Sequence, residues 1–220
     1  MSYPAEALDL LLDPAVWGGA DGLGARTLEH LGYSLLAVGL SAAIALPLGF
    51  AVGHFGRGRN VVVASSGVVR ALPTLGLLTL VALFTGLGLL APMVALVVLA
   101  VPSVLAGAYA GIESVDPRTV DAARAQGMSR WQVLTTVQIP LGLPLIVGGI
   151  RLATLQVVGT AILAAYVGAG GLGAPLFLGL RTYDYPLLLA ASAVVILLAL
   201  VLDLAFEIAQ RLLRRLPGLR

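Results

Sequence analysis

Apolar residues fill five long runs of the chain, and short stretches with charged residues, glycine or proline separate them. A helix needs about 20 mostly apolar residues to cross the hydrocarbon core of a bilayer. The five runs that meet this length are residues 31–55, 61–84, 87–110, 143–167 and 186–212. The second run contains Pro73, where we expect one kinked helix rather than two helices. The pattern therefore predicts an all-α integral membrane protein built as a bundle of five transmembrane helices.

The segments outside these runs are short, which predicts a single membrane domain at residues 31–212. Residues 1–30 are acidic, and their apolar stripe is too short to span a bilayer. We therefore expect an external N-terminal segment that is interfacial or disordered, and a basic tail at residues 213–220. The composition agrees, since 59% of the residues are hydrophobic and 11% are charged, against about 25% charged in soluble domains.

The arginines predict how the chain is oriented in the membrane. Five spans place three arginine-bearing segments on one face: the connection at residues 56–60, the segment 115–140 and the C-terminal tail. The opposite face carries Arg26 and Arg181. Because positively charged residues stay in the cytoplasm, we expect the N-terminus outside and the C-terminus in the cytoplasm.

Two further arginines, Arg70 and Arg151, lie inside apolar runs. A charge within a membrane is costly and is by default a functional hypothesis. The alternative for Arg151 is a position near enough to the cytoplasm for its side chain to snorkel. Asp203 and Glu207 lie one turn apart in the fifth run, where they predict a solvated face or partners for Arg211.

The segment 115–140 is polar and carries the signals of two short helices. Asp116 is suited to cap the first helix, with Pro117 at its first position, and Gly127 is placed to end it. Ser129 and Gln132 then form the pattern of a capping box.

We expect this second helix to end before Pro140, with Met128 and Val133 packed together at its start. Two alternatives remain for the segment. It is either a docking site on the cytoplasmic side or an interfacial hairpin packed on its own bundle.

The string DAARAQG, followed after eleven residues by IP, resembles the cytoplasmic EAA loop of ABC importer permeases. The matching positions are Asp121, Ala122, Ala123, Gly127, Ile139 and Pro140. Asp121 stands where the family has glutamate, which keeps the charge and shortens its reach by one methylene. The resemblance implies that this loop is the coupling helix, which sits in a groove of the ATPase subunit and transmits its closure to the membrane helices.

The string GAGGLGAPLFLGL, residues 168–180, resembles the extracellular gate loop of permeases for compatible solutes and some amino acids. The candidate gate glycines are Gly168, Gly170, Gly171 and Gly173. A dinucleotide site is rejected, because no predicted strand precedes the glycines. The alternative is a flexible connector.

The string RALPTLGLLTLVALF, residues 70–84, resembles the second span of permeases for glycine betaine, carnitine and choline. It makes Arg70, Pro73 and Thr74 candidates for the translocation path. The alternative for Pro73 and Thr74 is a kink that serves only packing. No predicted span offers an aromatic cage for a quaternary amine, the arrangement that binds such cations best.

The resemblance covers residues 25–212 and implies the fold of a type I, MetI-like ABC importer. It implies a permease subunit in the bacterial inner membrane, translocating an osmoprotectant such as glycine betaine, carnitine or choline. The implied partners are an ATPase subunit, an external substrate-binding protein and a second permease subunit, as a homodimer or a paralogous heterodimer, within membrane lipid and without nucleic acid.

The chain itself is expected to bind no cofactor and no metal and to have no catalytic residues. It contains no lysine, so it lacks the P-loop pattern, and ATP and Mg are expected on the partner ATPase. The alternatives are an importer of the same fold for an amino acid such as methionine, and a secondary transporter that works without ATP. A secondary transporter is disfavoured because acidic residues are scarce near the middle of the predicted spans.

Overall fold

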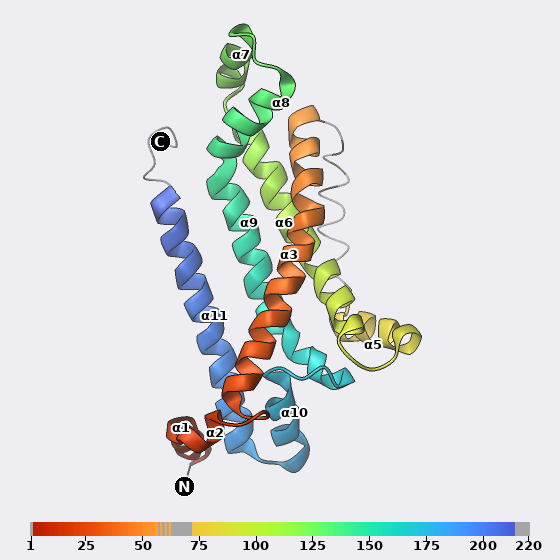
Figure 1. Cartoon of the computed structure of the whole chain (residues 1–220), viewed down its shortest axis with the longest axis vertical. Coiled ribbons are helices and arrows are strands. Elements are labelled where there is room, and N and C mark those ends of the chain that lie inside the picture. The colour runs from red at the N-terminus through yellow and green to blue at the C-terminus, as the bar shows by residue number, and fades with distance from the viewer. Residues whose placement is uncertain (1, 57, 59, 61, 63–71, 214–220) are drawn as a thin grey trace. The chain divides into compact units, whose positions relative to one another are not determined.

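The computed structural model describes residues 2–56, 58, 60, 62 and 72–213, and every regular element in them is a helix (Figure 1). The N-terminal elements are α1 (Tyr3–Leu12), α2 (Pro14–Trp17) and α3 (Leu23–Phe55). The middle elements are α5 (Thr74–Thr85), α6 (Leu90–Glu113), α7 (Pro117–Ala125), α8 (Arg130–Gln132) and the π-helix η1 (Val133–Gln138). The last elements are α9 (Ile139–Thr160), the 3-10 helix η2 (Ala161–Val167), α10 (Gly173–Thr182) and α11 (Tyr185–Leu213).

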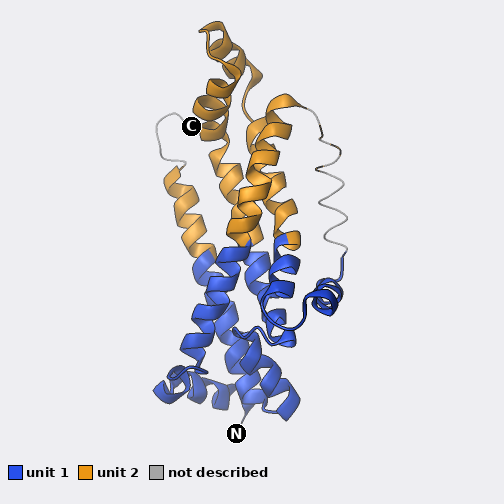
Figure 2. Ribbon diagram, turned by 45° about the vertical axis from the view of Figure 1, so that its right-hand side comes forward, with its two compact units in different colours: residues 1–37, 72–97, 154–202 blue, residues 38–71, 98–153, 203–220 orange. Residues whose placement is uncertain are grey.

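The chain divides into two compact units, and long helices contribute a part to each (Figure 2). Unit 1 comprises residues 1–37, 72–97 and 154–202, and unit 2 comprises residues 38–71, 98–153 and 203–220. Unit 1 therefore contains the glycine loop at residues 168–173, and unit 2 contains the segment 115–140.

The core of unit 1 is built from apolar side chains of several helices. Leu23 at the start of α3 is buried with Leu172 and with Val194 of α11. A second cluster joins Leu78 of α5 to Ala95 of α6 and Val167. The N-terminal residues 3–17 are helical in α1 and α2, and their external position stays a prediction.

Glycines bring the helices of unit 2 into backbone contact. A Cβ on Gly107 of α6 would lie 2.5 Å from the Cα of Gly149 of α9. A Cβ on Gly142 of α9 would lie 2.3 Å from the carbonyl oxygen of Gly111. Without a hydrophobic driving force in lipid, membrane helices associate through such small residues. The close crossing of α6 and α9 therefore holds α9 in place within unit 2.

Four helical runs in the described residues are long and apolar enough to cross a membrane: Leu23–Phe55, Leu90–Glu113, Arg130–Val167 and Tyr185–Leu213. They contain most of the first, third, fourth and fifth predicted spans. Residues 61 and 63–71 of the second predicted span lie outside the described residues, and its described end is the shorter helix α5.

The prediction of one kinked helix through Pro73 is wrong for the described part of this span. Leu72 and Pro73 are not helical, and α5 begins at Thr74. A proline disfavours helical geometry in the residue before it. Pro73 therefore occupies the N-cap position of α5 instead of bending a continuous helix.

Candidate coupling and gate sites

The helix α7 has the two end structures that the sequence predicts. At its start, Asp116 Oδ1 accepts a hydrogen bond from the Arg118 N–H at 2.8 Å, and Pro117 is the first helical residue. At its end, Gly127 has a φ of 85° and its N–H donates to the Arg124 carbonyl at 2.9 Å. The Met128 N–H donates to the Ala123 carbonyl at 3.3 Å, which completes a Schellman motif.

The next turn begins with the predicted capping box. The Gln132 N–H donates to Ser129 Oγ at 3.3 Å, and the Ser129 N–H donates to Gln132 Oε1 at 2.8 Å. Met128 packs on the buried cluster that includes Val133, as the sequence predicts. These two caps fix the sharp turn between α7 and α8.

The prediction that the second helix ends before Pro140 is wrong. From Arg130 the chain stays helical to Val167, and η1 ends at Gln138, two residues before Pro140. Proline has no N–H to donate and its ring collides with the carbonyl four residues earlier in a regular α-helix. The wider π turn changes the hydrogen-bond spacing at this point, so the helix passes through Pro140.

The paired alanines of the motif face different sides of α7. Ala123 is buried with Val115, Val120 and Val133, so it holds α7 onto its own unit. Asp121 and Ala122 are exposed, and so is Gly127. Ile139 and Pro140 are half-buried in the first turn of α9. The structure thus separates an inner, packing face of the loop from an outer face.

Trp131 is an exposed residue of α8 that the sequence analysis did not select. Its side chain is 71% exposed, next to the capping box of α8. Large exposed aromatic side chains are common at the centres of protein interfaces. In the sequence, its position one residue before Gln132 of the capping box was the signal that could have identified it.

A polar contact anchors the end of η1 to α3 within unit 2. Gln138 is buried, and its Oε1 lies within hydrogen-bond distance of His54 Nδ1. A buried amide needs such a partner. The π-helix is therefore held at its C-terminal end by α3, next to the crossing of α3 with α6 at Gly49 and Gly53.

The glycine loop depends on left-handed backbone geometry. Gly168, Gly170 and Gly171 have φ values of 80°, 80° and 69°. Gly173 begins α10 without a positive φ, but a Cβ there would lie 1.9 Å from the Ile162 carbonyl oxygen. The chain thus reverses tightly from η2 into α10, which requires glycine for conformation at three positions and for space at the fourth.

Charged side chains at the start of α3 hold this loop. Glu29 Oε2 accepts a hydrogen bond from the Gly171 N–H at 3.0 Å and from Arg26 Nη1 at 2.8 Å. Arg26 also pairs with Asp21. A Cβ on Gly170 would lie 2.8 Å from both Arg26 Nη1 and Glu29 Oε2. The sequence analysis missed this contact, because Glu29 and Gly171 are 142 residues apart.

His30, the residue after Glu29, is buried beside the same loop. Its ring Nε2 lies 2.9 Å from the Val158 carbonyl oxygen, to which it donates. Its Nδ1 is buried without a hydrogen-bond partner among the described residues. Since an imidazolium would need a second acceptor there, the environment favours the neutral ring.

The third group of predicted residues is only partly described. Arg70 lies outside the described residues. Pro73 is exposed before α5, and Thr74 is half-buried in its first turn. A translocation path formed by these three residues therefore stays a prediction.

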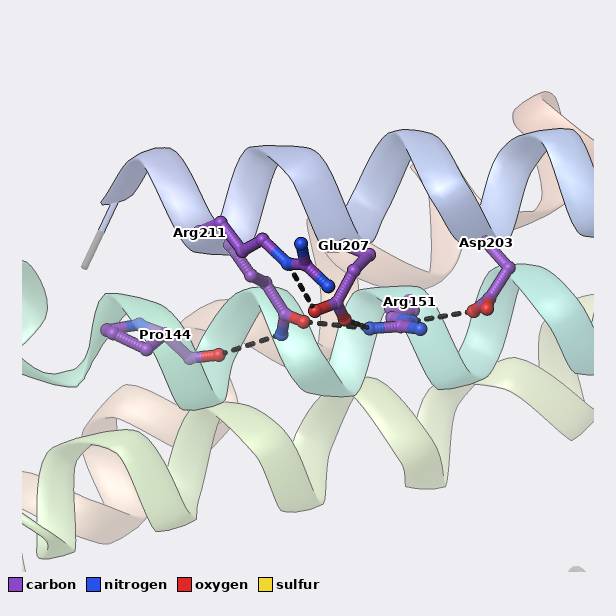
Figure 3. A network of polar contacts seen from close by, with 6 residues as sticks. Pro144, Arg151, Asp203, Glu207 and Arg211 are labelled. Atoms are coloured by element: carbon purple, nitrogen blue, oxygen red, sulfur yellow. Dashed lines mark hydrogen bonds and ion pairs between the residues drawn. The ribbon is translucent and has the colours of Figure 1, made fainter. Parts of the chain in front are cut away.

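Arg151 pairs with acidic residues of another helix, and its distance from the cytoplasmic surface stays a prediction. Its guanidinium is partly buried and donates to Asp203 and Glu207 of α11 (Figure 3). Glu207 also accepts from Arg211, as the sequence predicts. The spacing of Asp203 and Glu207 indicated one acidic helix face, but the sequence did not indicate that Arg151 lies opposite it.

The comparisons with known proteins match this architecture. Residues 43–216 match the family described as the binding-protein-dependent transport system inner membrane component. The chain belongs to this family. It is therefore an inner-membrane transport component of a family whose transport depends on a binding protein.

Curated relatives cover most of the chain. It is 34% identical over 186 residues to the glycine betaine/carnitine/choline transport system permease protein OpuCB of Bacillus subtilis, covering 84% of this chain and 86% of that protein. It is 36% identical over 180 residues to the carnitine transport permease protein OpuCB of Listeria monocytogenes, covering 82% and 83%.

Solved structures share the fold. An inward-facing structure of the MetNI methionine ABC transporter aligns with a TM-score of 0.75 and 23% identity over 88% of this chain and 96% of that chain. An amino acid ABC transporter with histidines aligns with a TM-score of 0.67 and 20% identity over 98% and 99%. At these identities the likeness establishes the MetI-type fold alone.

Proposed function

We propose that this chain is the permease subunit of an ATP-driven importer for a small osmoprotectant such as glycine betaine, carnitine or choline. The observation that carries the proposal is the doubly capped loop at residues 117–132, which we call the coupling loop. It combines a rigid inner face with an exposed outer face. The substrates named for the relatives support the choice of solute class.

The outer face of this loop docks into a separate ATPase subunit, which binds the ATP and Mg. Asp121 and Ala122 are exposed on α7, and Trp131 is exposed on α8 directly after the turn. Small residues allow close approach, and an exposed aromatic side chain supplies apolar area for an interface. The Schellman motif at Gly127 keeps this face in one orientation, so that a push on the loop moves the helix that follows it.

The glycine loop, held by Glu29, is the outer gate in this proposal. Two permease subunits, identical or related, enclose the path, and an external binding protein delivers the solute. The N-terminus lies outside and the C-terminus in the cytoplasm, which places the coupling loop on the ATPase side. Arg118, Arg124 and Arg130 in the described part of this loop support that orientation.

The test is uptake of labelled glycine betaine, choline and methionine into proteoliposomes that contain the permease, its ATPase and its binding protein. ATP-dependent uptake of the quaternary amines alone is the expected result. Uptake of methionine instead would keep the mechanism and replace the solute. Uptake that persists without ATP or without the ATPase would reject the importer and favour a secondary transporter.

A matched pair of variants at Gly127 tests the coupling loop itself. Gly127→Asn keeps a residue that tolerates the left-handed conformation, whereas Gly127→Ala does not. We expect the asparagine variant to bind the ATPase in a pull-down with purified subunits and the alanine variant to bind it weakly. Equal binding by both variants would show that the Schellman turn does not orient the docking face.

A further inference from the structure

Arg151 of α9 lies opposite three side chains of one face of α11. Its Nε donates to Asp203 Oδ1 at 2.7 Å, and its Nη1 donates to Glu207 Oε2 at 2.6 Å. Nη1 also donates to Gln210 Oε1 at 3.0 Å. The three acceptors are four and three residues apart, the spacing of one helix face. Figure 3 shows Arg151 between Asp203 and Glu207, and we call these four residues the Arg151 network.

The Arg151 network continues to the backbone of α9. Gln210 Nε2 donates to the Pro144 carbonyl oxygen at 3.2 Å. Gly148, one turn after Pro144, leaves room for this contact, since a Cβ there would lie 3.3 Å from Gln210 Nε2. The side-chain amide of Gln210 thus makes two hydrogen bonds: its oxygen accepts from Arg151, and its nitrogen donates to the backbone of α9. All the atoms of this connection belong to unit 2.

Apolar side chains of the described end of α11 are only partly covered, with Phe206 and Leu213 half-buried. Large apolar side chains of this end, Leu204, Ile208 and Leu212, are 50–60% exposed. In a bilayer the hydrophobic effect does not drive helices together, so association depends on close packing and on polar contacts between helices. The crossing of α6 and α9, by contrast, is held by glycine contacts. Residues 203–213 are therefore attached to α9 through the Arg151 network.

The helix that carries Arg151 is the continuation of the coupling loop. Arg130–Val167 is one continuous helical run of 38 residues, which begins at the capping box of α8. Arg151 lies 21 positions after Arg130, roughly 30 Å along a regular helix. A displacement of α8 thus reaches Arg151 through covalent backbone and helical hydrogen bonds, without crossing a loop.

We propose that the Arg151 network transmits the movement of the coupling loop from α9 to α11, so that the two helices move as one body. This inference rests on the proposed function. In it, Arg151 is a positioning residue and has no contact with the solute. The planar guanidinium suits this role because its fork of donors engages two carboxylates at once in fixed directions. Both carboxylates of the network, Asp203 and Glu207, are engaged by an arginine.

The first test distinguishes the transmission of movement from α9 to α11 from the simple need of Asp203 and Glu207 for a positively charged partner. Arg151→Met alone leaves Asp203 without its arginine partner and Glu207 with Arg211 alone, a change that destabilises by itself. The triple variant Arg151→Met, Asp203→Asn, Glu207→Gln removes the ion pairs between the two helices, and the one charge that loses its partner, Arg211, is 72% exposed. The matched control is Arg211→Met, because Arg211 is 72% exposed and pairs with Glu207 along α11 without reaching α9.

The readouts are ATP hydrolysis and uptake of labelled glycine betaine, measured on the same proteoliposomes with the ATPase and binding protein. We expect the triple variant to hydrolyse ATP at the wild-type rate and to lose about tenfold in solute taken up per ATP, a factor typical of coupling between sites. The Arg211→Met control keeps the wild-type ratio. A wild-type ratio in the triple variant, or an equal loss of both activities, would overturn the proposal.

The second test does not depend on transport. The chain has no cysteine, so two introduced cysteines are its only labelling sites. Leu145 of α9 and Ile208 of α11 are 47% and 50% exposed and are suited to carry spin labels. In the complex, with partner cysteines replaced, the distance between the labels is expected to be the same with and without ATP. A distance that changes with ATP in this otherwise wild-type chain would refute movement as one body. Absence of ATP-dependent uptake by the wild-type complex would instead reject the proposed function.

Discussion

The coupling loop and the glycine loop both contain glycines in the left-handed conformation, but the space around these glycines differs. At Gly127 of the coupling loop, a Cβ would meet no atom within 4 Å, so glycine is needed for conformation alone. At Gly170 and Gly173, a Cβ would collide with charged side chains or with backbone. The coupling loop is thus a rigid turn with an open outer side, whereas the glycine loop is packed against α3 and η2.

This difference agrees with the roles proposed for the two loops. A docking surface must be free on one side and fixed on the other, which the buried Ala123 and the exposed Ala122 achieve. A gate must have contacts that open and close, and the Gly171 contact to Glu29 is a single hydrogen bond of that kind. Substitutions at the two loops should therefore differ in size and in kind.

The largest effect is expected for Gly173→Ala. A Cβ 1.9 Å from the Ile162 carbonyl oxygen must displace backbone, and overpacking of this kind typically costs about 1–3 kcal/mol, here at the upper end. Thermal unfolding of the purified chain in detergent measures it. The control is Gly159→Ala in α9, where a Cβ meets nothing within 4 Å. Equal melting temperatures of the two variants would contradict tight packing at the glycine loop.

Gly127→Ala should have a smaller and more local effect. The left-handed conformation costs a residue with a Cβ roughly 1–2 kcal/mol, but no neighbour has to move. Amide hydrogen exchange is expected to increase in residues 117–132 and to stay unchanged in residues 168–182. Increased exchange in both segments would mean that the two loops are not independent in stability.

Glu29→Gln should lower the free energy that stabilises the glycine loop against opening by about 1 kcal/mol, the typical value for one hydrogen bond. The carboxylate loses its charge opposite Arg26, while an amide oxygen remains to accept from the Gly171 N–H. Exchange of the Gly171 amide proton measures the change. The control Glu6→Gln alters an acid of α1 without touching this contact. Equal exchange rates of the Gly171 amide proton in wild type and in Glu29→Gln would show that the charge of Glu29 does not stabilise the gate.

The smallest effect is expected for Ser129→Ala, which removes one of the two hydrogen bonds of the capping box. Loss of a serine N-cap costs roughly 0.5–2 kcal/mol, and the exposed position of this cap places it at the lower end. Affinity for the ATPase subunit should fall only slightly. A larger loss than for Gly127→Ala would show that the turn of α8, rather than the end of α7, orients the docking face.

Local signals predicted the coupling loop well. The caps at Asp116, Gly127 and Ser129 each depend on residues within four positions, so their geometry can be inferred from spacing alone. The continuation through Pro140 was mispredicted, because a π turn has no clear sequence signal. The break at Pro73 was mispredicted for a similar reason, since proline is compatible with both a kink and a helix start.

Sequence alone determined the membrane class, four of the helical runs, the caps of the coupling loop and the family, because these follow from local composition and short-range spacing. Tertiary structure decided which side of α7 faces outward, that Glu29 holds the glycine loop and that Arg151 joins α9 to α11. Each of these contacts joins residues that are distant in sequence. A charged residue in a membrane must have a partner, but only the packing of the helices specifies which residue that partner is.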